Sequence, residues 1–332
     1  MKTLDVLSVG DIVTDAFIKL LDNEGQVIQT EKGLRLSLPF ATKVPFDHAE
    51  VIEAVGNSAN AAVCFARLGF GSGLVANVGS DKYGRDMIDA LHDNEVDSRF
   101  VRINPHKISN YHYVLWYKDE RTILIKHEEY EYYWPHLRPN EIPQWLYFSS
   151  ISKNAIDFHD DVADWLEKHP EVKLAFQPGT FQMQAGAKRL ERIYKQTEVL
   201  LLNREEAVVV GGGKHEDVNN LFDHLHALGP KIVVITDGPR GAYASGPEGR
   251  YQMPNYPDPK PPFERTGAGD AFSATFVGAL MKGSNIEGAL QWAPINAMSV
   301  VQQVGAQRGL LTEHQLAHLL KEAPQWYHPK RL

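Results

Sequence analysis

The chain has 332 residues, of which 43% are hydrophobic and 23% are charged, the proportions of a soluble globular protein. Its 34 lysines and arginines against 42 acidic residues give a formal charge of −8, and no run of basic residues forms the stripe that nucleic-acid binding usually needs. These numbers argue against a nucleic-acid partner but leave room for a locally built phosphate site.

The N-terminal stretch Met1–Leu7 carries Asp5 within its short apolar run, which is typical of a first strand and not of a signal peptide. No stretch approaches the ~18 apolar residues of a membrane span. The single cysteine, Cys64, excludes an intramolecular disulfide and lies among apolar neighbours, so we expect a buried, inert thiol. Together these features predict a cytoplasmic protein without a membrane partner.

Apolar strands alternate with amphipathic helices along most of the chain, which predicts a mainly parallel sheet with helices on both faces. The expected strands are Leu4–Val9, Gly73–Val78, Trp145–Phe148, Val172–Phe176, Val199–Leu202 and Lys231–Thr236. The expected helices are Ser58–Leu68, Tyr83–Asn94, Asp160–His169, Ala185–Gln196, Val218–Leu228, Ala271–Lys282, Ile286–Val304 and Thr312–Glu322. We expect one domain over residues 1–332.

Two segments, about 16–52 and 108–128, break this rhythm and are typical of strands and turns. The first has a predicted hairpin turn at Asp22–Gly25, and the second turns near Lys118–Glu120. Large side chains occupy both faces of the second segment, so each face must cover something. Either one face closes over a ligand while the other meets a second subunit, giving a homodimer through this lid, or both faces pack on the parent domain.

The segment Glu264–Phe272 carries the clearest chemical signal. Gly267, Ala268 and Gly269 come directly before a predicted helix, whose first turn offers free N–H groups and the positive end of a dipole. An anion can approach this backbone closely because few side chains stand in the way. Asp270 would then face a bound phosphate and could take the proton of an attacking hydroxyl. Alternatively, Asp270 only caps the helix.

At these residues the sequence resembles the PfkB/ribokinase family of carbohydrate and nucleoside kinases, whose signature it matches at Thr266, Gly267–Asp270 and Phe272. The resemblance implies that Asp270 is the catalytic base and that the amides of Gly267, Ala268 and Gly269 form an anion hole, with Thr266 beside the nucleotide. Glu264 and Arg265 depart from the signature, at a place where some members build a monovalent-cation site. K⁺ activation therefore stays open as an expectation.

Earlier motifs resemble the acceptor site of the same family. Asp15, after the first strand, occupies the place where members bind sugar hydroxyls, and a strand-end cap is the alternative. The segment Val55–Ala62 resembles the Gly-Gly-x-x-x-Asn motif, although Val55 replaces its first glycine. The resemblance implies substrate contacts for Gly56, Asn57 and Asn60, while Asn60 has the alternative of satisfying local backbone at the helix start.

Later motifs resemble the nucleotide site. Asn203–Glu206 matches an Asn-x-x-Glu motif that organises Mg²⁺, largely through water; the same spacing is also typical of a capping box. Thr236, Gly238 and Gly241 match the nucleotide loop, and Asn296 lies where members surround adenine and ribose. By contrast, Gly211–His215 lacks the Walker A spacing, and the 14 histidines form no zinc pattern.

The resemblance covers about residues 3 to 320. It implies an α/β protein with a ribokinase-like three-layer α/β/α domain, a mainly parallel central sheet and a small β-sheet lid. The expected reaction is ATP- and Mg²⁺-dependent phosphorylation of a small sugar, ribose- or fructose-like. A nucleoside is the alternative acceptor, and a non-catalytic nucleotide- or sugar-binding regulatory protein is the alternative of another class.

Overall fold

The computed structural model describes residues 3–31, 33–118, 120–212, 217–263 and 265–332. Asp119 of the expected turn, Gly213–His215 of the rejected Walker segment and Glu264 of the signature lie outside the described residues.

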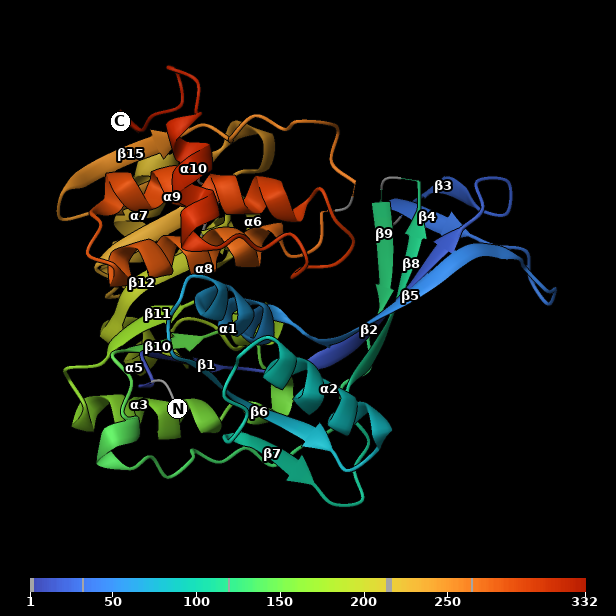
Figure 1. Cartoon of the computed structure of the whole chain (residues 1–332), viewed down its shortest axis with the longest axis horizontal. Coiled ribbons are helices and arrows are strands. Elements are labelled where there is room, and N and C mark those ends of the chain that lie inside the picture. The colour runs from blue at the N-terminus through green and yellow to red at the C-terminus, as the bar shows by residue number, and fades with distance from the viewer. Residues whose placement is uncertain (1–2, 32, 119, 213–216, 264) are drawn as a thin grey trace.

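A ten-stranded sheet, in the order β16-β15-β14-β13-β12-β11-β10-β1-β6-β7, runs through the centre of the molecule (Figure 1). Its strands are β1 (Val6–Val9), β6 (Ser72–Gly79), β7 (Val101–Asn104), β10 (Trp145–Phe148), β11 (Lys173–Phe176), β12 (Thr197–Asn203), β13 (Ile232–Thr236), β14 (Ala242–Gly246), β15 (Gly249–Met253) and β16 (Lys330–Arg331). From β7 across to β13 neighbouring strands run parallel, whereas β14, β15 and β16 are antiparallel additions at one edge.

Helices cover both faces of this sheet and give the expected three layers. One face carries α1 (Asn57–Arg67), α2 (Lys82–Asp93), α8 (Ala268–Met281), α9 (Ile286–Val300) and α10 (Glu313–Lys321). The other carries α3 (Phe158–Lys168), α5 (Glu191–Gln196), α6 (Arg204–Gly211) and α7 (Val218–Ala227), with the short α4 (Thr180–Ala185) next to α6. Because each central strand buries side chains on both faces, the strands are nearly continuous apolar runs.

The predicted elements are found within a few residues of their expected bounds, with two corrections. Ala185–Gln196 is not one helix: Gly186 ends α4 with a φ of 86°, and α5 starts only at Glu191. Asp22–Gly25 is a turn but does not join paired strands, because β2 (Val13–Leu20) pairs with other strands. The hairpin there is formed instead by β3 (Gln26–Thr30) and β4 (Gly33–Ser37).

A separate four-stranded sheet, the small sheet, projects from the main body (Figure 1). Its strands, in spatial order, are β5 (Phe46–Val55), β2, β8 (Tyr111–Tyr117) and β9 (Glu120–Leu124). One face is partly covered, since Phe17, Val114 and Trp116 are buried and the Trp116 ring lies 5.1 Å from that of Phe263 on the main body.

The opposite face of the small sheet exposes apolar side chains such as Tyr113 and Leu124. At the base of this face, Tyr111 packs against Tyr83 of α2, with the ring centres 4.7 Å apart.

The carboxyl ends of β1, β10, β11, β12 and β13 meet at one edge of the large sheet, where open α/β sheets bind ligands. β1 lies between β6 and β10, of which β6 comes earlier in the chain and β10 later, so the strand order changes direction at β1. The start of α8 and the base of the small sheet lie against this edge. Among the described residues, no helix combines the length and apolarity needed to cross a bilayer.

Within the described residues, short 3₁₀ turns are formed by η1 (Pro139–Glu141), η2 (Lys153–Ala155) and η3 (Gly238–Arg240).

Candidate active site

The N-terminus of α8 is exposed at this edge and is built on a residue that must be glycine. Gly267 precedes the helix with a φ of 78°, in the left-handed region. A Cβ there would lie 2.2 Å from the Cβ of Ala306. The first-turn N–H groups of Ala268 and Gly269 have no acceptor within the helix. Their positive dipole end, unobstructed by side chains, is suited to an anion.

Asp270 lies in this first turn, and its carboxylate is held by amides from other segments. Asn57 Nδ2 donates to Oδ1 and Asn60 Nδ2 to Oδ2, each at 2.8 Å, and Gln177 Nε2 donates to Oδ1 at 3.2 Å. These partners belong to α1 and to the end of β11, so the side chain does more than cap its own helix. Burial raises the pKa of Asp270, while the three amide donors act in the opposite direction.

Two further contacts fix the orientation of these amides. Gln307 Nε2 donates to Asn60 Oδ1 at 3.0 Å, which leaves the Asn60 NH₂ for Asp270. Tyr147 donates its hydroxyl to Gln177 Oε1 at 2.5 Å, and burial raises the pKa of Tyr147 so that this phenol stays protonated. Asn60 is therefore not spent on local backbone. The network leaves Asp270 with spare acceptor capacity, since a carboxylate offers about four lone-pair sites.

Asp15 lies inside β2 and not at the end of a strand, so the strand-end cap interpretation is wrong. Asp15 is 8% exposed, and His112 Nδ1 lies 3.3 Å from Asp15 Oδ1. Gly56, with a φ of 109°, brings the start of α1 against the first loop: a Cβ there would lie 2.9 Å from the carbonyl oxygen of Asp11. The structure thus brings Asn57 and Asn60 onto Asp270, with Gly56 at the start of the same helix, and places Asp15 beside His112 in the small sheet.

Asn203 and Glu206 form a reciprocal cap at the start of α6. Asn203 N–H donates to Glu206 Oε2 and Glu206 N–H donates to Asn203 Oδ1, both at 2.8 Å. Asn203 pairs in register with Thr236 across β12 and β13, which places both at the ligand edge. Burial raises the pKa of Glu206, with the nearby Asp270 charge adding to the effect. A cation beside this carboxylate would offset that cost, so the oxygens fit Mg²⁺.

The loop after β13 turns through two glycines in the left-handed region, Gly238 at 51° and Gly241 at 87°. Beside it opens a cavity of about 500 Å³. The lining is largely apolar and comprises Gly238, Pro239, Asn255, Tyr256, Asp258, Pro262, Arg265, Ala268, Pro294, Ala297, Met298 and Val301. The cavity thus connects the glycine loop with the start of α8.

The expectation for Asn296 needs correction with respect to its side chain. Asn296 is completely buried, its Nδ2 donates to Thr275 Oγ1 at 2.7 Å, and its Oδ1 accepts from Leu311 N–H at 2.9 Å. It therefore holds α8, α9 and the following loop together. The next residue, Ala297, lines the cavity in its place.

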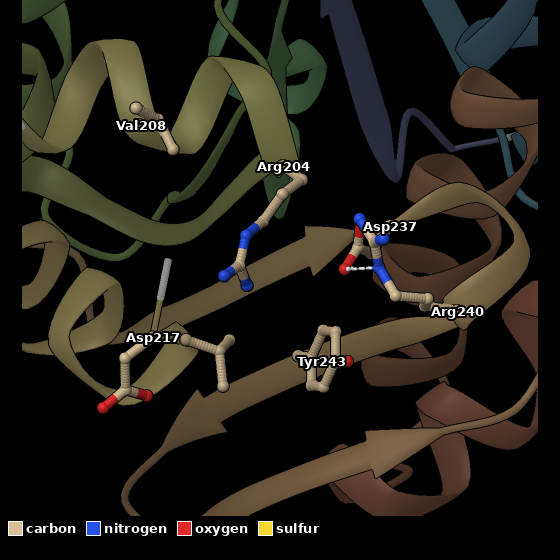
Figure 2. A pocket seen from close by; sticks show the side chains of 7 residues that line it. Arg204, Val208, Asp217, Asp237, Arg240 and Tyr243 are labelled. Atoms are coloured by element: carbon tan, nitrogen blue, oxygen red, sulfur yellow. Dashed lines mark hydrogen bonds and ion pairs between the residues drawn. The ribbon is translucent and has the colours of Figure 1, made fainter. Parts of the chain in front are cut away.

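A second cavity, of about 580 Å³, lies on the other side of the glycine loop, toward α6 and α7. Figure 2 shows that charged side chains gather there and that Arg240 is turned onto Asp237, with Arg240 Nη2 2.7 Å from Asp237 Oδ1. Its other lining residues are Arg204, Val208, Asp217, Val218 and Tyr243. Asp237 and Arg240 pair with each other and so hold the loop in its bent form.

Two features of the site were not predicted from the sequence: the contact of Gln177 with Asp270, and the pairing of Asp11 and Asp15 with two histidines. A signal for Gln177 existed, because a polar residue directly follows the apolar strand β11 at the carboxyl edge. The histidines lie more than 95 residues from their carboxylate partners, and no local pattern marks such a pairing.

The family model for pfkB family carbohydrate kinases matches residues 42–313. Ribokinase from Bacillus subtilis is 28% identical over 276 residues, covering 80% of this chain and 87% of the relative. Among solved structures, Arabidopsis thaliana ribokinase complexed with ribose and ATP has a TM-score of 0.77 at 21% identity and covers 97% of this chain and 99% of its own.

A nucleoside kinase from Methanocaldococcus jannaschii, an archaeal member of the ribokinase family, has a TM-score of 0.74 at 17% identity and covers 97% of this chain and 99% of its own. At these identities the structures show a shared fold, and the family match over most of the chain shows the family. The chain therefore belongs to the PfkB family of carbohydrate kinases, phosphotransferases that act on an alcohol group.

Proposed function

We propose that this protein transfers the γ-phosphate of ATP to a hydroxyl of a small ribose- or fructose-like sugar, with Asp270 as the general base. The observation that carries this proposal is the position of the Asp270 carboxylate. It is buried, held by three amides and located in the first turn of α8, beside the free N–H groups at the glycine-rich helix start. A base and an anion-binding site thus share one helix terminus.

In this scheme the acceptor hydroxyl donates to the remaining acceptor position of Asp270 and loses its proton as it attacks. The raised pKa of Asp270 makes it a stronger base than an exposed aspartate. The amides of Gly267, Ala268 and Gly269 stabilise charge on the transferring phosphoryl oxygens, with Thr266 at the approach to this turn.

The nucleotide would lie between the glycine loop and the cavity that Ala268 and Ala297 line. The apolar walls of this cavity suit the nucleobase, while Thr236 and Asn203 lie on the path toward α8. Glu206 and Asn203 would hold Mg²⁺, in part through water, and this ion supplies charge neutralisation to the phosphates.

Asp15, Gly56, Asn57 and Asn60 would bind the acceptor, under a lid formed by the small sheet. Asp15 is itself part of that sheet, so closure over the site would bring Asp15 onto the sugar and exclude water. We further propose that the exposed face of the small sheet pairs with a second copy, because its apolar side chains, including Tyr113 and Leu124, otherwise face solvent. Light scattering at micromolar concentration measures this, and a monomer contradicts it.

A nucleoside is the second candidate acceptor, since a nucleoside kinase shares the fold. The deciding experiment is a coupled assay of ADP release with a panel of sugars and nucleosides. Asp270→Asn should reduce kcat about a hundredfold or more, the usual scale for loss of a general base. Glu205→Gln, an exposed change next to Glu206, serves as the control. Full activity of Asp270→Asn would refute the mechanism, and nucleotide binding without turnover of any panel member would favour a regulatory protein.

A further inference from the structure

Two carboxylates and two histidines meet at the acceptor side of the site. Asp11 follows β1 and Asp15 lies on β2, while His112 lies on β8 and His127 follows β9. His127 Nδ1 is 3.5 Å from Asp11 Oδ2 and His112 Nδ1 is 3.3 Å from Asp15 Oδ1. The two imidazole rings are 5.2 Å apart, centre to centre. The four side chains thus form two neighbouring Asp–His pairs.

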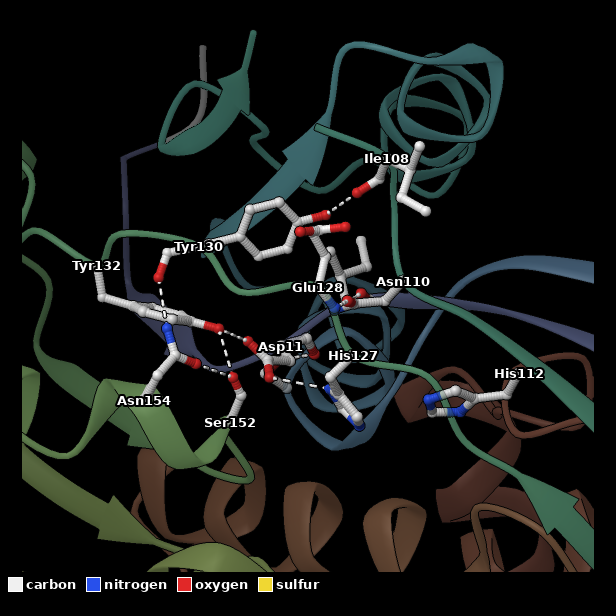
Figure 3. A network of polar contacts seen from close by, with 12 residues as sticks. Asp11, Ile108, Asn110, His112, His127, Glu128, Tyr130, Tyr132, Ser152 and Asn154 are labelled. Carbon is white, nitrogen blue, oxygen red and sulfur yellow. Dashed lines mark hydrogen bonds and ion pairs between the residues drawn. The ribbon is translucent and has the colours of Figure 1, made fainter. Parts of the chain in front are cut away.

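The fold holds these pairs in place from behind. Figure 3 shows Tyr132 reaching Asp11 from one side and His127 from the other, while Ser152 contacts Tyr132 and Asn154 contacts Ser152. Tyr132 donates its hydroxyl to Asp11 Oδ1 at 2.7 Å, and burial, with the Asp11 charge next, raises the pKa of this phenol so that it remains a donor. Asp15 and His112 are direct neighbours in the register of β2 and β8. Asp11 therefore has one carboxylate oxygen, Oδ1, bound by Tyr132, and a second, Oδ2, that accepts no hydrogen bond within the described residues.

The leftover atoms of the pairs are buried. In the described part of the chain, Asp11 Oδ2, Asp15 Oδ1, His112 Nε2 and His127 Nδ1 each lack a hydrogen-bond partner. The Nδ1–Oδ distances in the two Asp–His pairs, 3.3 and 3.5 Å, are longer than those of ordinary N–H···O hydrogen bonds. Buried polar groups are almost always satisfied in native proteins, so a cluster of unsatisfied ones points to a missing ligand.

The cluster is connected to the proposed base by two segments. On one side, Ser58 Oγ donates to the carbonyl of Asp11 at 3.0 Å, and the preceding Asn57 donates to Asp270. On the other side, His127 packs edge-on against Phe181 at 6.3 Å between ring centres, four residues after Gln177 of the Asp270 network. The segments that hold Asp270 therefore also contact the cluster, which favours a ligand that reaches both.

The charge of the cluster restricts that ligand. Asp11, Asp15 and Asp270 are three carboxylates at one site, and within the described residues the ion pairs of Asp11 and Asp15 are with histidines alone. Carboxylates accept from hydroxyls, and imidazoles donate to or accept from them. A phosphate or carboxylate on the acceptor would instead meet like charge without a lysine or arginine at these two aspartates to balance it.

We propose that His112 and His127 determine acceptor specificity, each binding one hydroxyl together with its aspartate, so that the acceptor is an uncharged polyol and sugars already carrying phosphate or carboxylate are excluded. This inference rests on the proposed kinase function and names the substrate class of the same site. It assigns to Asp11 a role equal to that of Asp15.

The first test compares wild-type kcat/KM at saturating ATP for D-ribose, D-fructose, D-fructose 6-phosphate, D-gluconate and adenosine. A neutral sugar should exceed both anionic acceptors by about a hundredfold or more, since like charges brought together at a binding site cost several kcal/mol. Preference for fructose 6-phosphate or gluconate overturns the inference while leaving the kinase function intact. Preference for adenosine, which is uncharged and carries ribose hydroxyls, upholds the exclusion of anionic acceptors and assigns a nucleoside as the acceptor. Turnover of none of them overturns the proposed function, and the inference with it.

The second test uses His112→Phe and His127→Phe, which keep a flat ring but remove its nitrogens. Each should raise KM for the neutral sugar about 10- to 100-fold, as expected for a lost hydrogen bond in a charged pair, with KM for ATP unchanged. His112→Gln should restore much of the affinity, and His314→Phe, on the exposed start of α10, is the matched control. Sugar binding by calorimetry without ATP gives the same comparison independently of turnover. Unchanged sugar affinity in both folded Phe variants overturns the assignment.

Discussion

Gly267 and Gly269 differ in what a side chain would meet, and this difference gives a sharp prediction. In Gly267→Ala the new Cβ would lie 2.2 Å from Ala306 Cβ and 2.5 Å from Ala306 Cα, at a φ of 78°. The left-handed conformation costs about 1–2 kcal/mol for a non-glycine residue, and forcing an atom into a packed contact costs about 1–3 kcal/mol more. We expect Gly267→Ala to lower the free energy of unfolding by about 2–5 kcal/mol.

Gly269→Ala is the matched control, because nothing lies within 4 Å of its added Cβ and the residue is helical. Alanine there should leave stability unchanged or raise it by about 0.5–1 kcal/mol. Urea unfolding followed by fluorescence gives both values. Gly267→Ala should also lose kcat, since relief of the contact moves the start of α8. Equal stability of the two variants would refute the packing argument.

Two further predictions concern protonation. Asp270 must be ionised to act as a base, and burial raises its pKa, so kcat/KM should fall on acidification at a higher pH than expected for an exposed aspartate. Gln177→Met removes a hydrogen-bond donor to this carboxylate and should move the acid limb of the pH profile to higher pH. An acid limb that does not move contradicts the assignment of Asp270 as the base. Burial also lowers the pKa of His159 to about 4, so between about pH 6.5 and 4 the unfolded chain binds the extra proton. Stability should then drop by about 2 kcal/mol from pH 7.5 to 5, and His159→Gln should flatten that slope in urea titrations; identical slopes refute it.

The contacts of both ring nitrogens of His159 also favour its neutral form. Its Nδ1 faces the carbonyl of Ala155 at 3.0 Å and its Nε2 faces Gln182 Nε2 at 3.1 Å. The Gln182 amide is oriented by Gly179 N–H, which donates to its oxygen at 2.7 Å. One imidazole nitrogen must therefore donate and the other accept, which only the neutral ring can do.

Local patterns were sufficient for the layers of the fold. Strands buried on both faces are apolar throughout, and glycine or a capping residue begins or ends most helices, so elements such as β10 and α7 could be predicted almost to the residue. The same reasoning failed where pairing between distant segments decides. β2 pairs with β5 on one side and, on the other, with β8, which lies nearly a hundred residues away in the chain. Turn residues cannot specify pairing between strands that are so far apart.

Contiguous residues were enough to reveal the family, the glycine-rich helix start and the position of Asp270 in its first turn, because their spacing sets local geometry. Cys64 was likewise predictable as an inert thiol, and the structure confirms that it is buried, with its pKa raised to about 12. The folded chain was needed to show which amides hold Asp270, that Asn296 faces the core, and that two histidines lie against Asp11 and Asp15. Such contacts arise where separate strands and helices meet at one sheet edge, and their partners are set by chain packing and not by neighbouring sequence.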